Sequence, residues 1–402
     1  MEGLTTGERD AVAQARAHVS LAEVERWSNI NSGTRNLEGL ATMAGVLTDA
    51  FSVLPGELRL VDAPPVEQVG ADGAVRELDH GRHLHMAVRP GAPAQMLFTG
   101  HMDTVYPRDH PFQSCTMRED GTLGGPGVAD MKGGLAVMLA ALRAVESAPH
   151  AERLGYEIVI NADEETGSLS SAALLAQAAR GKIAALTYEP ALADGTLAGA
   201  RGGTGNFSIT VRGRSAHAGR NPEDGRNAVV AAADVALRLA RSAGRGLAVN
   251  PARIDGGGPN NVVPDLAVLR VNFRPQTAAD IERARAHIDA AVAMTAAEHE
   301  VAITVHGGFN RPPKPVDDGA QALFERVRAA GVDLGLTIGW RTTGGVCDGN
   351  NIAAAGVPVV DTMGVRGGAI HSADEYMIPE SLGERAALSA LTILRIATDG
   401  RP

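Results

Sequence analysis

Short apolar runs alternate with longer stretches of helical periodicity between residues 95 and 189. Apolar runs bounded by turn-forming residues predict buried strands, and apolar positions at helical spacing predict helices. Strands are expected at 95–99, 156–162 and 183–188, and helices at 131–146 and 170–180. This β-α-β-α-β order predicts an α/β fold with a mixed, mostly parallel sheet flanked by helices.

A second pattern occupies residues 203–311. Strands are expected at 206–211, 247–254, 266–273 and 301–306, and helices at 227–241 and 278–297. The order β-α-β-β-α-β predicts a ferredoxin-like α+β unit. Turn-forming residues mark both of its ends, Gly202-Gly203 at the entry and Arg311-Pro312-Pro313-Lys314-Pro315 at the exit.

The α/β pattern returns after the second unit. A helix is expected at 321–330, a strand at 357–361 and a closing helix at 381–396. The smaller unit is therefore predicted to be inserted in the larger one. We expect one discontinuous domain made of residues 1–202 and 312–402, interrupted by a domain of residues 203–311.

Composition and charge exclude several classes of protein. The 402 residues carry 37 Lys and Arg against 47 Asp and Glu, a net charge of −10 without a long basic run, which argues against a nucleic-acid partner. The most apolar helical stretch, residues 135–142, is far shorter than the roughly 20 residues of a membrane span. The acidic N-terminal segment is unlike a secretory signal, and the two cysteines form no CxxC motif. A soluble, cytoplasmic protein of more than one domain is predicted.

Polar clusters follow the predicted strands of the larger unit, where open α/β sheets place their ligands. His101 and Asp103 come directly after the strand at 95–99. In an extended backbone these two side chains point to the same side, so that the carboxylate could orient the imidazole. A polar strand end with a surface histidine is the alternative interpretation.

Asp130 stands in a glycine-rich segment, residues 124–134, that leads into a helix. A helix N-cap would account for Asp130 without any ligand, whereas the glycines on both sides suggest a close approach of the backbone to a bound group. Nucleotide-binding motifs do not fit. Gly125-Pro126-Gly127 lacks the third glycine of a dinucleotide fingerprint, and Gly181-Lys182 has Ala176 where a P-loop requires glycine.

Three adjacent carboxylates, Asp163-Glu164-Glu165, follow the strand at 156–162. Such groups repel one another unless they are solvated or bound to cations, so a solvated acidic turn is the alternative. Glu189 ends the strand at 183–188, and His371 stands in a later glycine-rich segment. Two histidines and at least three carboxylates at successive sheet ends form the mixed N/O donor set of a divalent-metal hydrolase.

The formal charges of this set suit two divalent cations. Their +4 balances Asp130, Glu165 and Glu189 together with a bridging hydroxide, which leaves Glu164 as a proton carrier. The absence of cysteine from the set favours oxygen and nitrogen ligation over a structural zinc-thiolate site.

These residues resemble the motifs of the M20 family of co-catalytic zinc metallopeptidases, which includes glutamate carboxypeptidases, acetylornithine deacetylases and succinyl-diaminopimelate desuccinylases. The resemblance runs from about residue 95 to 375 and rests on His101-Met102-Asp103, residues 127–134, Asp163-Glu164-Glu165 and His371. It implies a zinc exopeptidase-like fold whose inserted ferredoxin-like domain serves as a lid and in dimerisation. It also implies two divalent metal ions, Zn²⁺ in the first place, with Co²⁺ or Mn²⁺ as alternatives.

The resemblance also implies a role for each residue of the set. Asp130 would bridge the two ions, His101 and Glu189 would complete one of them, and Glu165 and His371 the other. Asp103 would support His101. Glu164 would be the general base that takes a proton from the bridging water and delivers it to the leaving nitrogen. A cis peptide bond is expected between Asp130 and Met131.

Further substrate contacts are implied in the inserted unit and in a late loop. His217 matches a histidine that reaches the active site of the other subunit and stabilises the oxyanion, so a homodimer is expected. Asn261 and Arg274 resemble the segment that holds the free carboxylate of the substrate, which a guanidinium binds through both oxygens. Gly345 lies in the glycine-rich loop 344–351, which resembles a substrate-facing loop of the glutamate carboxypeptidases. Without the resemblance, His217 and Arg274 would be ordinary surface residues.

The predicted function is hydrolysis of an amide bond that links an acyl or peptidyl group to an amino acid with a free carboxylate, as in glutamate carboxypeptidases. The substrate would be a small peptide or an N-acyl amino acid, with no nucleic-acid or membrane partner. The alternatives are an N-acyl-amino-acid deacylase of the acetylornithine deacetylase type, an N-carbamoyl amidohydrolase and an inactive metal-binding homologue. Glu189 occupies a position where aspartate is more usual in the carboxypeptidases, and Cys347 one where serine or threonine is.

Overall fold

A six-stranded sheet forms the centre of the larger unit in the computed structural model, which describes residues 3–402. Its strand order is β1-β4-β8-β5-β9-β17, and its four strands from β8 to β17 are parallel, with β4 and β1 added antiparallel at one edge. The strands are β1 (Glu57–Val61), β4 (His83–Val88), β5 (Ala94–His101), β8 (Leu154–Asn161), β9 (Ala184–Thr187) and β17 (Val359–Val360). The predicted mixed, mostly parallel sheet is confirmed.

Helices cover both faces of this sheet because alternate residues of its central strands point to opposite sides. On β5, Met96 and Phe98 belong to the larger apolar core, whereas Leu97 packs on the other face with α5 and α9. The larger core is built with α1 (Thr6–His18), α2 (Leu21–Ser28), α3 (Leu37–Phe51), α4 (Gly133–Glu146), α8 (Asp318–Asp333) and α10 (Ser381–Asp399). The opposite face carries α5 (Ala172–Ala179) and α9 (Asp348–Ala354).

Short strands hold the loops at the carboxyl edge of the main sheet. A five-stranded sheet has the order β10-β18-β19-β7-β6, and β11 pairs in parallel with β16. These strands are β6 (Thr116–Met117), β7 (Leu123–Gly124), β10 (Ala191–Leu192), β11 (Leu197–Arg201), β16 (Trp340–Thr343), β18 (Arg366–Gly368) and β19 (Tyr376–Met377).

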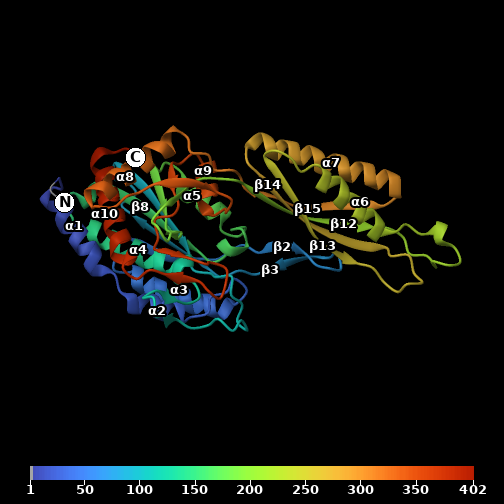
Figure 1. The fold of residues 1–402 in the computed structure, drawn as a ribbon, viewed down its shortest axis with the longest axis horizontal. Coiled ribbons are helices and arrows are strands. Elements are labelled where there is room, and N and C mark those ends of the chain that lie inside the picture. The colour runs from blue at the N-terminus through green and yellow to red at the C-terminus, as the bar shows by residue number, and fades with distance from the viewer. Residues whose placement is uncertain (1–2) are drawn as a thin grey trace.

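The second unit is the body at the right of Figure 1, with two helices on one face of an antiparallel sheet. Along the chain its elements are β12 (Thr204–Arg212), α6 (Ala228–Arg241), β13 (Leu247–Gly256), β14 (Leu266–Pro275), α7 (Ala278–His299) and β15 (Ala302–Arg311). The sheet order β13-β14-β12-β15 is that of a split β-α-β fold, and the unit has apolar clusters of its own. The predicted α/β class with an inserted ferredoxin-like unit is confirmed.

A hairpin of the larger unit reaches across to the second sheet (Figure 1). It consists of β2 (Val66–Val69) and β3 (Val75–Leu78). The Arg270 Nη2 donates a hydrogen bond of 2.7 Å to the Val69 carbonyl, and the Arg212 Nη2 donates one of 3.1 Å to the Gly73 carbonyl. The two units are therefore in contact at a place far from the linkers that join them.

The structure corrects two predicted boundaries. The helix expected from Met131 begins at Gly133, because Asp130 and Met131 have non-helical backbone angles; the peptide bond between them is cis, as expected. The loop expected at 344–351 ends earlier, since α9 begins at Asp348. The Cys347 N–H donates to the Asn350 Oδ1 over 3.1 Å and its Sγ accepts from the Gly349 N–H, so this residue caps the helix.

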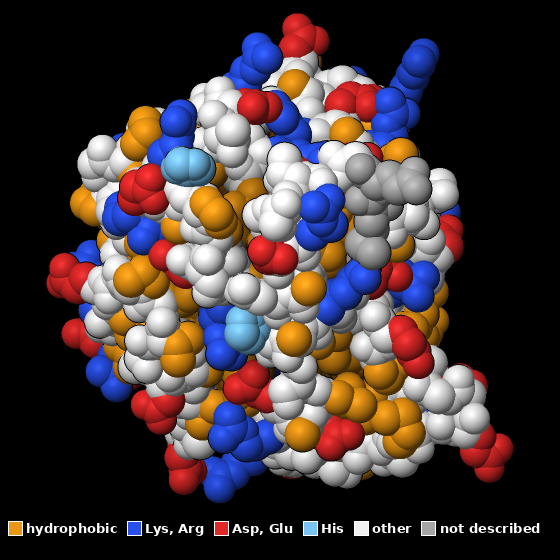
Figure 2. Space-filling view, turned by 90° about the vertical axis from the view of Figure 1, so that its left-hand side faces the viewer, with side chains coloured by type: hydrophobic (Ala, Val, Ile, Leu, Met, Phe, Trp, Pro, Cys, Tyr) orange, Lys and Arg blue, Asp and Glu red, His pale blue; other side chains and the backbone are white. Residues whose placement is uncertain are grey.

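In the part of the chain that the structure describes, the face of the larger unit that carries both termini has no large patch of a single charge. Figure 2 shows basic and acidic side chains interspersed over the end of the molecule at which both termini lie. No helix among residues 3–402 is long and apolar enough to cross a membrane.

Candidate active site

The fold gathers the predicted donor residues at one edge of the main sheet. His101 ends β5, the segment 163–165 follows β8, and Glu189 comes shortly after β9. These three strands are parallel neighbours, so their carboxyl ends meet at the same edge. Asp130 reaches the edge from the turn before α4, and His371 from the loop between β18 and β19.

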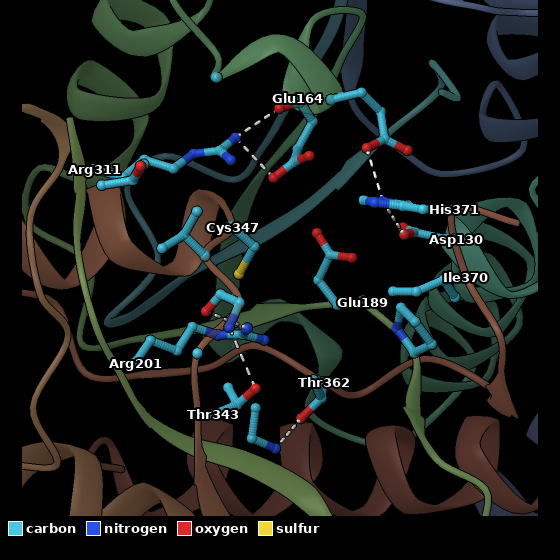
Figure 3. Close-up of a pocket in the computed structure, with 18 of the residues that line it drawn as sticks. Asp130, Glu164, Glu189, Arg201, Arg311, Thr343, Cys347, Thr362, Ile370 and His371 are labelled. Carbon is cyan, nitrogen blue, oxygen red and sulfur yellow. Dashed lines mark hydrogen bonds and ion pairs between the residues drawn. The ribbon is translucent and has the colours of Figure 1, made fainter. Parts of the chain in front are cut away.

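Asp130 lies between two groups of donor atoms. Its Oδ1 is 3.1 Å from the Nε2 of His101, which is itself 3.8 Å from the Oε1 of Glu189. Its Oδ2 is 3.3 Å from the Nε2 of His371, which is 3.1 Å from the Oε2 of Glu165. One carboxylate therefore faces two separate His and Glu pairs. Figure 3 shows Asp130 beside His371, with Glu189 nearby.

Two overlapping sets of donors are compact enough to hold an ion. Ligand atoms of His101, Asp130 and Glu165 lie within 4.8 Å of one another, as do those of His101, Glu164 and Glu189. Imidazole nitrogen and carboxylate oxygen are ligands that Zn²⁺, Co²⁺ and Mn²⁺ accept. The residues present at this edge therefore fit divalent metal binding.

The side chains of this edge influence one another's ionisation. Burial and then the Asp130 charge raise the pKa of Glu165 to about 7, and burial also raises the pKa of Glu189. Hydrogen bonds to Asp130 and Glu165 raise the pKa of His371 to about 11. So many carboxylates withdrawn from water require positive charge, which protonated histidines or bound cations can supply.

Asp103 contacts His101 through its backbone carbonyl, and its carboxylate binds the turn at residues 163–165. The Nδ1 of His101 lies 2.9 Å from the Asp103 backbone carbonyl oxygen, and 3.4 Å from its Oδ1. The carboxylate accepts the N–H groups of Glu164 and Glu165, both over 3.2 Å, and the Thr34 hydroxyl over 2.7 Å. Asp103 therefore fixes the 163–165 turn and, through its carbonyl, the orientation of His101.

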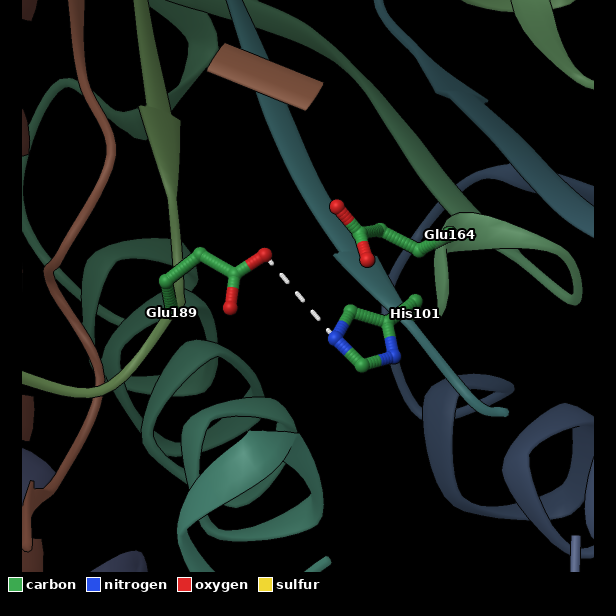
Figure 4. A group of neighbouring side chains, drawn as sticks. All are labelled: His101, Glu164 and Glu189. Atoms are coloured by element: carbon green, nitrogen blue, oxygen red, sulfur yellow. Dashed lines mark ion pairs between the residues drawn. The ribbon is translucent and has the colours of Figure 1, made fainter. Parts of the chain in front are cut away.

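Glu164 is buried beside the His101 and Glu189 pair, with a carboxylate oxygen within 4.8 Å of their donor atoms (Figure 4). Burial raises the pKa of Glu164 well above its usual value, and the nearby Arg311 guanidinium opposes that shift. A carboxyl group with a raised pKa next to a donor cluster is suited to accept and return a proton.

A cavity of about 800 Å³ opens onto this edge. Its lining includes Asp130, Glu164, Glu165, Glu189 and His371, together with Arg274 and Gly345. The structure does not bring His217 or Asn261 into the cavity of the same chain. Both lie in neighbouring loops of the second unit, where the Ala218 N–H donates to the Asn261 carbonyl over 2.9 Å, and His217 is exposed.

Glu375, which is not among the predicted site residues, shapes the turn around Asp130. Its carboxylate accepts the N–H groups of Ala129 and Asp130, each over 3.0 Å, and that of Gly127 over 3.2 Å. The Tyr106 hydroxyl donates a fourth bond of 2.8 Å. In the sequence, Glu375 stands four residues after His371, and this closeness was the one signal that could have placed it near the site.

Replacement of Glu375 by Ala should lower the affinity for divalent metal by about 10- to 100-fold, the usual effect of losing a group that supports a ligand. Three backbone N–H groups of the turn would lose their acceptor, among them that of Asp130. The affinity can be measured by zinc competition with a chromophoric chelator. Glu384→Gln, which alters an ion-paired carboxylate outside the cavity lining, is the control. An unchanged affinity in Glu375→Ala would contradict this role.

Two arginines were also overlooked, because each lies at a linker between the units. Arg201 binds both oxygens of the buried Asp361 and donates to the Gly345 carbonyl over 3.0 Å. Arg311 reaches Glu164, as Figure 3 shows. The sequence placed both residues beside glycine and proline breakers, a position that reveals no partner for either side chain.

The fold and the site define a class of protein. A mixed α/β unit with histidine and carboxylate donors at its strand ends, joined to an inserted ferredoxin-like unit, is a layout suited to a metal-dependent hydrolase.

The chain belongs to peptidase family M20/M25/M40, whose sequence profile matches residues 97–395. It is 28% identical over 377 residues to carboxypeptidase G2 of Pseudomonas sp. (strain RS-16), covering 92% of this chain and 88% of that protein. It is also 28% identical over 306 residues to a succinyl-diaminopimelate desuccinylase of Acidovorax ebreus, covering 71% of this chain and 76% of the relative.

The fold is that of a solved aminopeptidase PepT from Bacillus cereus. The two structures superpose with a TM-score of 0.71 at 24% sequence identity, covering 95% of this chain and 99% of the other. The predicted M20 resemblance is confirmed, and the protein is a hydrolase of this family. The family is one of metal-dependent peptidases, and the His and carboxylate clusters could bind such ions.

Proposed function

We propose that the protein hydrolyses an amide bond between an acyl or peptidyl group and an amino acid that keeps a free carboxylate, in the manner of a glutamate carboxypeptidase. The observation that carries this proposal is the position of Asp130 between two His and Glu pairs, with the buried Glu164 beside one of them. The similarity to carboxypeptidase G2 over most of both chains supports it.

Two divalent ions, Zn²⁺ first among them, would be held by His101 and Glu189 on one side, by Glu165 and His371 on the other, and by Asp130 between them. When bound, such ions polarise a carbonyl and lower the pKa of water. Asp103 contributes by fixing His101 and the turn that carries Glu164 and Glu165.

The proton transfers fall to Glu164. Its carboxylate would take a proton from the water as the water oxygen attacks the carbonyl carbon, and would give that proton to the departing nitrogen as the C–N bond breaks. Arg274 lines the cavity from the second unit and is suited to bind the free carboxylate of the substrate. Gly345 lies on the cavity wall, where its carbonyl is held by Arg201.

His217 and Asn261 would serve the cavity of a second copy of the chain. Both are absent from the lining of their own cavity, and they lie together in the second unit. We infer that residues 203–311 form a lid and dimerisation domain inserted in a catalytic domain of residues 1–202 and 312–402. In such a homodimer the His217 imidazole would stabilise the oxyanion.

An N-acyl-amino-acid deacylase is the second candidate, favoured by the similarity to a succinyl-diaminopimelate desuccinylase. Both activities need the same metal donors and the same general base. Enzymes with these two activities differ in the pocket residues that contact the acyl group and the side chain of the substrate.

The proposal is tested by a substrate panel under metal control. Purified protein is stripped with a chelator and assayed on acyl-glutamates, dipeptides with varied C-terminal residues and N-acetylornithine, before and after addition of Zn²⁺, Co²⁺ or Mn²⁺. We expect no turnover in the stripped protein, recovery on adding metal, and a preference for substrates with a C-terminal glutamate. Full activity without metal, or turnover of none of the substrates with metal restored, would contradict the proposal.

A further inference from the structure

Arg311 links the inserted unit to the proposed general base. It is the last residue of β15, is buried, and its side chain extends out of the second unit into the active-site cavity. The Nη2 atom donates a hydrogen bond of 2.8 Å to the backbone carbonyl of Glu164. It also lies 2.7 Å from the Oε1 of the same residue, in an ion pair that does not have hydrogen-bond geometry. One guanidinium therefore holds both the main chain and the carboxylate of Glu164 (Figure 3).

The same guanidinium joins two further segments of the larger unit. Its Nη2 donates to the Ser168 Oγ over 2.8 Å and lies 3.6 Å from the Oδ1 of Asp348, at the start of α9. Asp348 in turn accepts a bond of 2.7 Å from the buried Asn161, at the end of β8. Arg311 therefore contacts several groups at the sheet edge of the larger unit.

The linkers between the units are fastened a few residues from Arg311. Arg201 and Lys314 exchange two backbone hydrogen bonds of 2.9 Å, and both side chains reach the buried Asp361. The Asn350 amide donates to the carbonyls of Gly202 and Pro312, over 2.9 and 2.7 Å. We call this group of four residues the linker clasp: Arg201, Lys314, Asp361 and Asn350. The linker clasp lies in the larger unit or at its border, whereas Arg311 belongs to a strand of the inserted unit.

We propose that Arg311 is a positioning residue through which the orientation of the inserted unit sets the position of the Glu164 carboxylate. The inference rests on the proposed function, because it assigns a task to the same general base. A rotation of the inserted unit about the linker clasp moves the end of β15, and with it the guanidinium that holds Glu164. The base is then aligned only while the inserted unit is seated over the cavity.

The physical reason is that a glutamate has several rotatable bonds and needs a fixed partner to stay aligned. A buried guanidinium that pairs with the carboxylate and also bonds the backbone carbonyl of the same residue restricts Glu164 more than a neutral neighbour does. Small errors in the placement of a reacting group lower the rate by about 10²-fold for a displacement of 1 Å.

The test compares Arg311→Met and Arg311→Lys with the wild type on a substrate that the wild type cleaves. Arg238→Met is the matched control, since Arg238 also pairs with carboxylates of the inserted unit but lies outside the cavity lining. We expect kcat to fall by about 10²-fold in Arg311→Met with little change in KM, and Arg238→Met to behave as the wild type. A third variant, Arg311→Ala, removes most of the side chain. Added guanidinium ion at a non-denaturing concentration should restore part of kcat to this variant.

A second readout does not depend on catalysis. Hydrogen exchange of the metal-free protein should be faster in residues 163–168 of Arg311→Met than in the wild type, and unchanged there in Arg238→Met. If Arg311→Met does not fold, Arg311→Lys carries the same comparison, because it keeps the charge and loses the guanidinium whose Nη2 atom contacts both Glu164 and Ser168.

Three results would overturn the inference. These are an unchanged kcat in Arg311→Met, a rise in KM with kcat unchanged, which would make Arg311 a substrate-binding residue, and unchanged exchange in residues 163–168. If the wild type cleaves no amide with metal restored, the proposed function fails instead, while the exchange measurement still tests the contact between Arg311 and the turn of Glu164.

Discussion

Replacement of Glu164 by Gln is expected to lower kcat by about 10²- to 10⁴-fold while metal binding stays at the wild-type level. The side chain is buried beside the donor cluster, and its amide analogue has nearly the same shape but cannot accept and return a proton. Steady-state kinetics on a cleaved substrate, with metal content measured on the same samples, provide the comparison.

The neighbouring Glu165 offers a matched contrast. Its carboxylate lies 3.1 Å from His371, in the cluster that we assign to metal binding, so Glu165→Gln should lose metal as well as activity. A Glu164→Gln protein as active as the wild type would refute the assignment of this residue as the base. A Glu164→Gln protein that loses metal to the same degree as Glu165→Gln would make Glu164 a ligand instead.

Two inactive variants mixed together should regain about a quarter of the wild-type activity if His217 acts across a symmetric dimer. The pair is Glu164→Gln and His217→Ala. In a mixed dimer one cavity combines an intact Glu164 with the partner's intact imidazole, and half of the randomly assorted dimers are mixed. The reason to expect this arrangement is that His217 is exposed and lies outside the cavity of its own chain.

The measurement is activity after subunit exchange, with the oligomeric state followed by light scattering. Each variant mixed with itself is the control for recovery during the incubation. Absence of recovery despite exchange of subunits would show that His217 acts within one chain or not at all. A fully active monomer would exclude the dimeric arrangement altogether.

Local patterns in the sequence were sufficient for most of the fold that carries the site. Apolar runs ending in polar residues located β5, β8 and β9. A change from the alternating β-α order to the order β-α-β-β-α-β located the inserted unit. Because parallel neighbours end at a common edge, the sequence also predicted that His101, Glu165 and Glu189 would meet. The alternative interpretation of Asp130 as a helix N-cap is wrong. Lys132 takes the N-cap position of α4, and the Asp130 side chain contacts His101 and His371.

The remaining parts depend on residues that are distant in the chain and share no local signal. Glu375 supports the turn of Asp130 across 245 positions, and Arg311 reaches Glu164 across 147. The glycines and prolines around Arg311 predicted only a break in structure. A long flexible side chain gives no indication in the sequence of which buried carboxylate will accept it.

The sequence by itself was sufficient to predict which side chains would bind metal and move a proton, because such predictions depend on residue type and on strand ends that local periodicity reveals. Only the tertiary structure decided that Asp130 faces two His and Glu pairs with different oxygens, and that His217 and Asn261 are absent from the cavity of their own chain. It also decided that an arginine of the inserted unit holds Glu164. Such relations are set by the packing of segments against one another, since burial forces each charged group to find a partner wherever the fold brings one within reach.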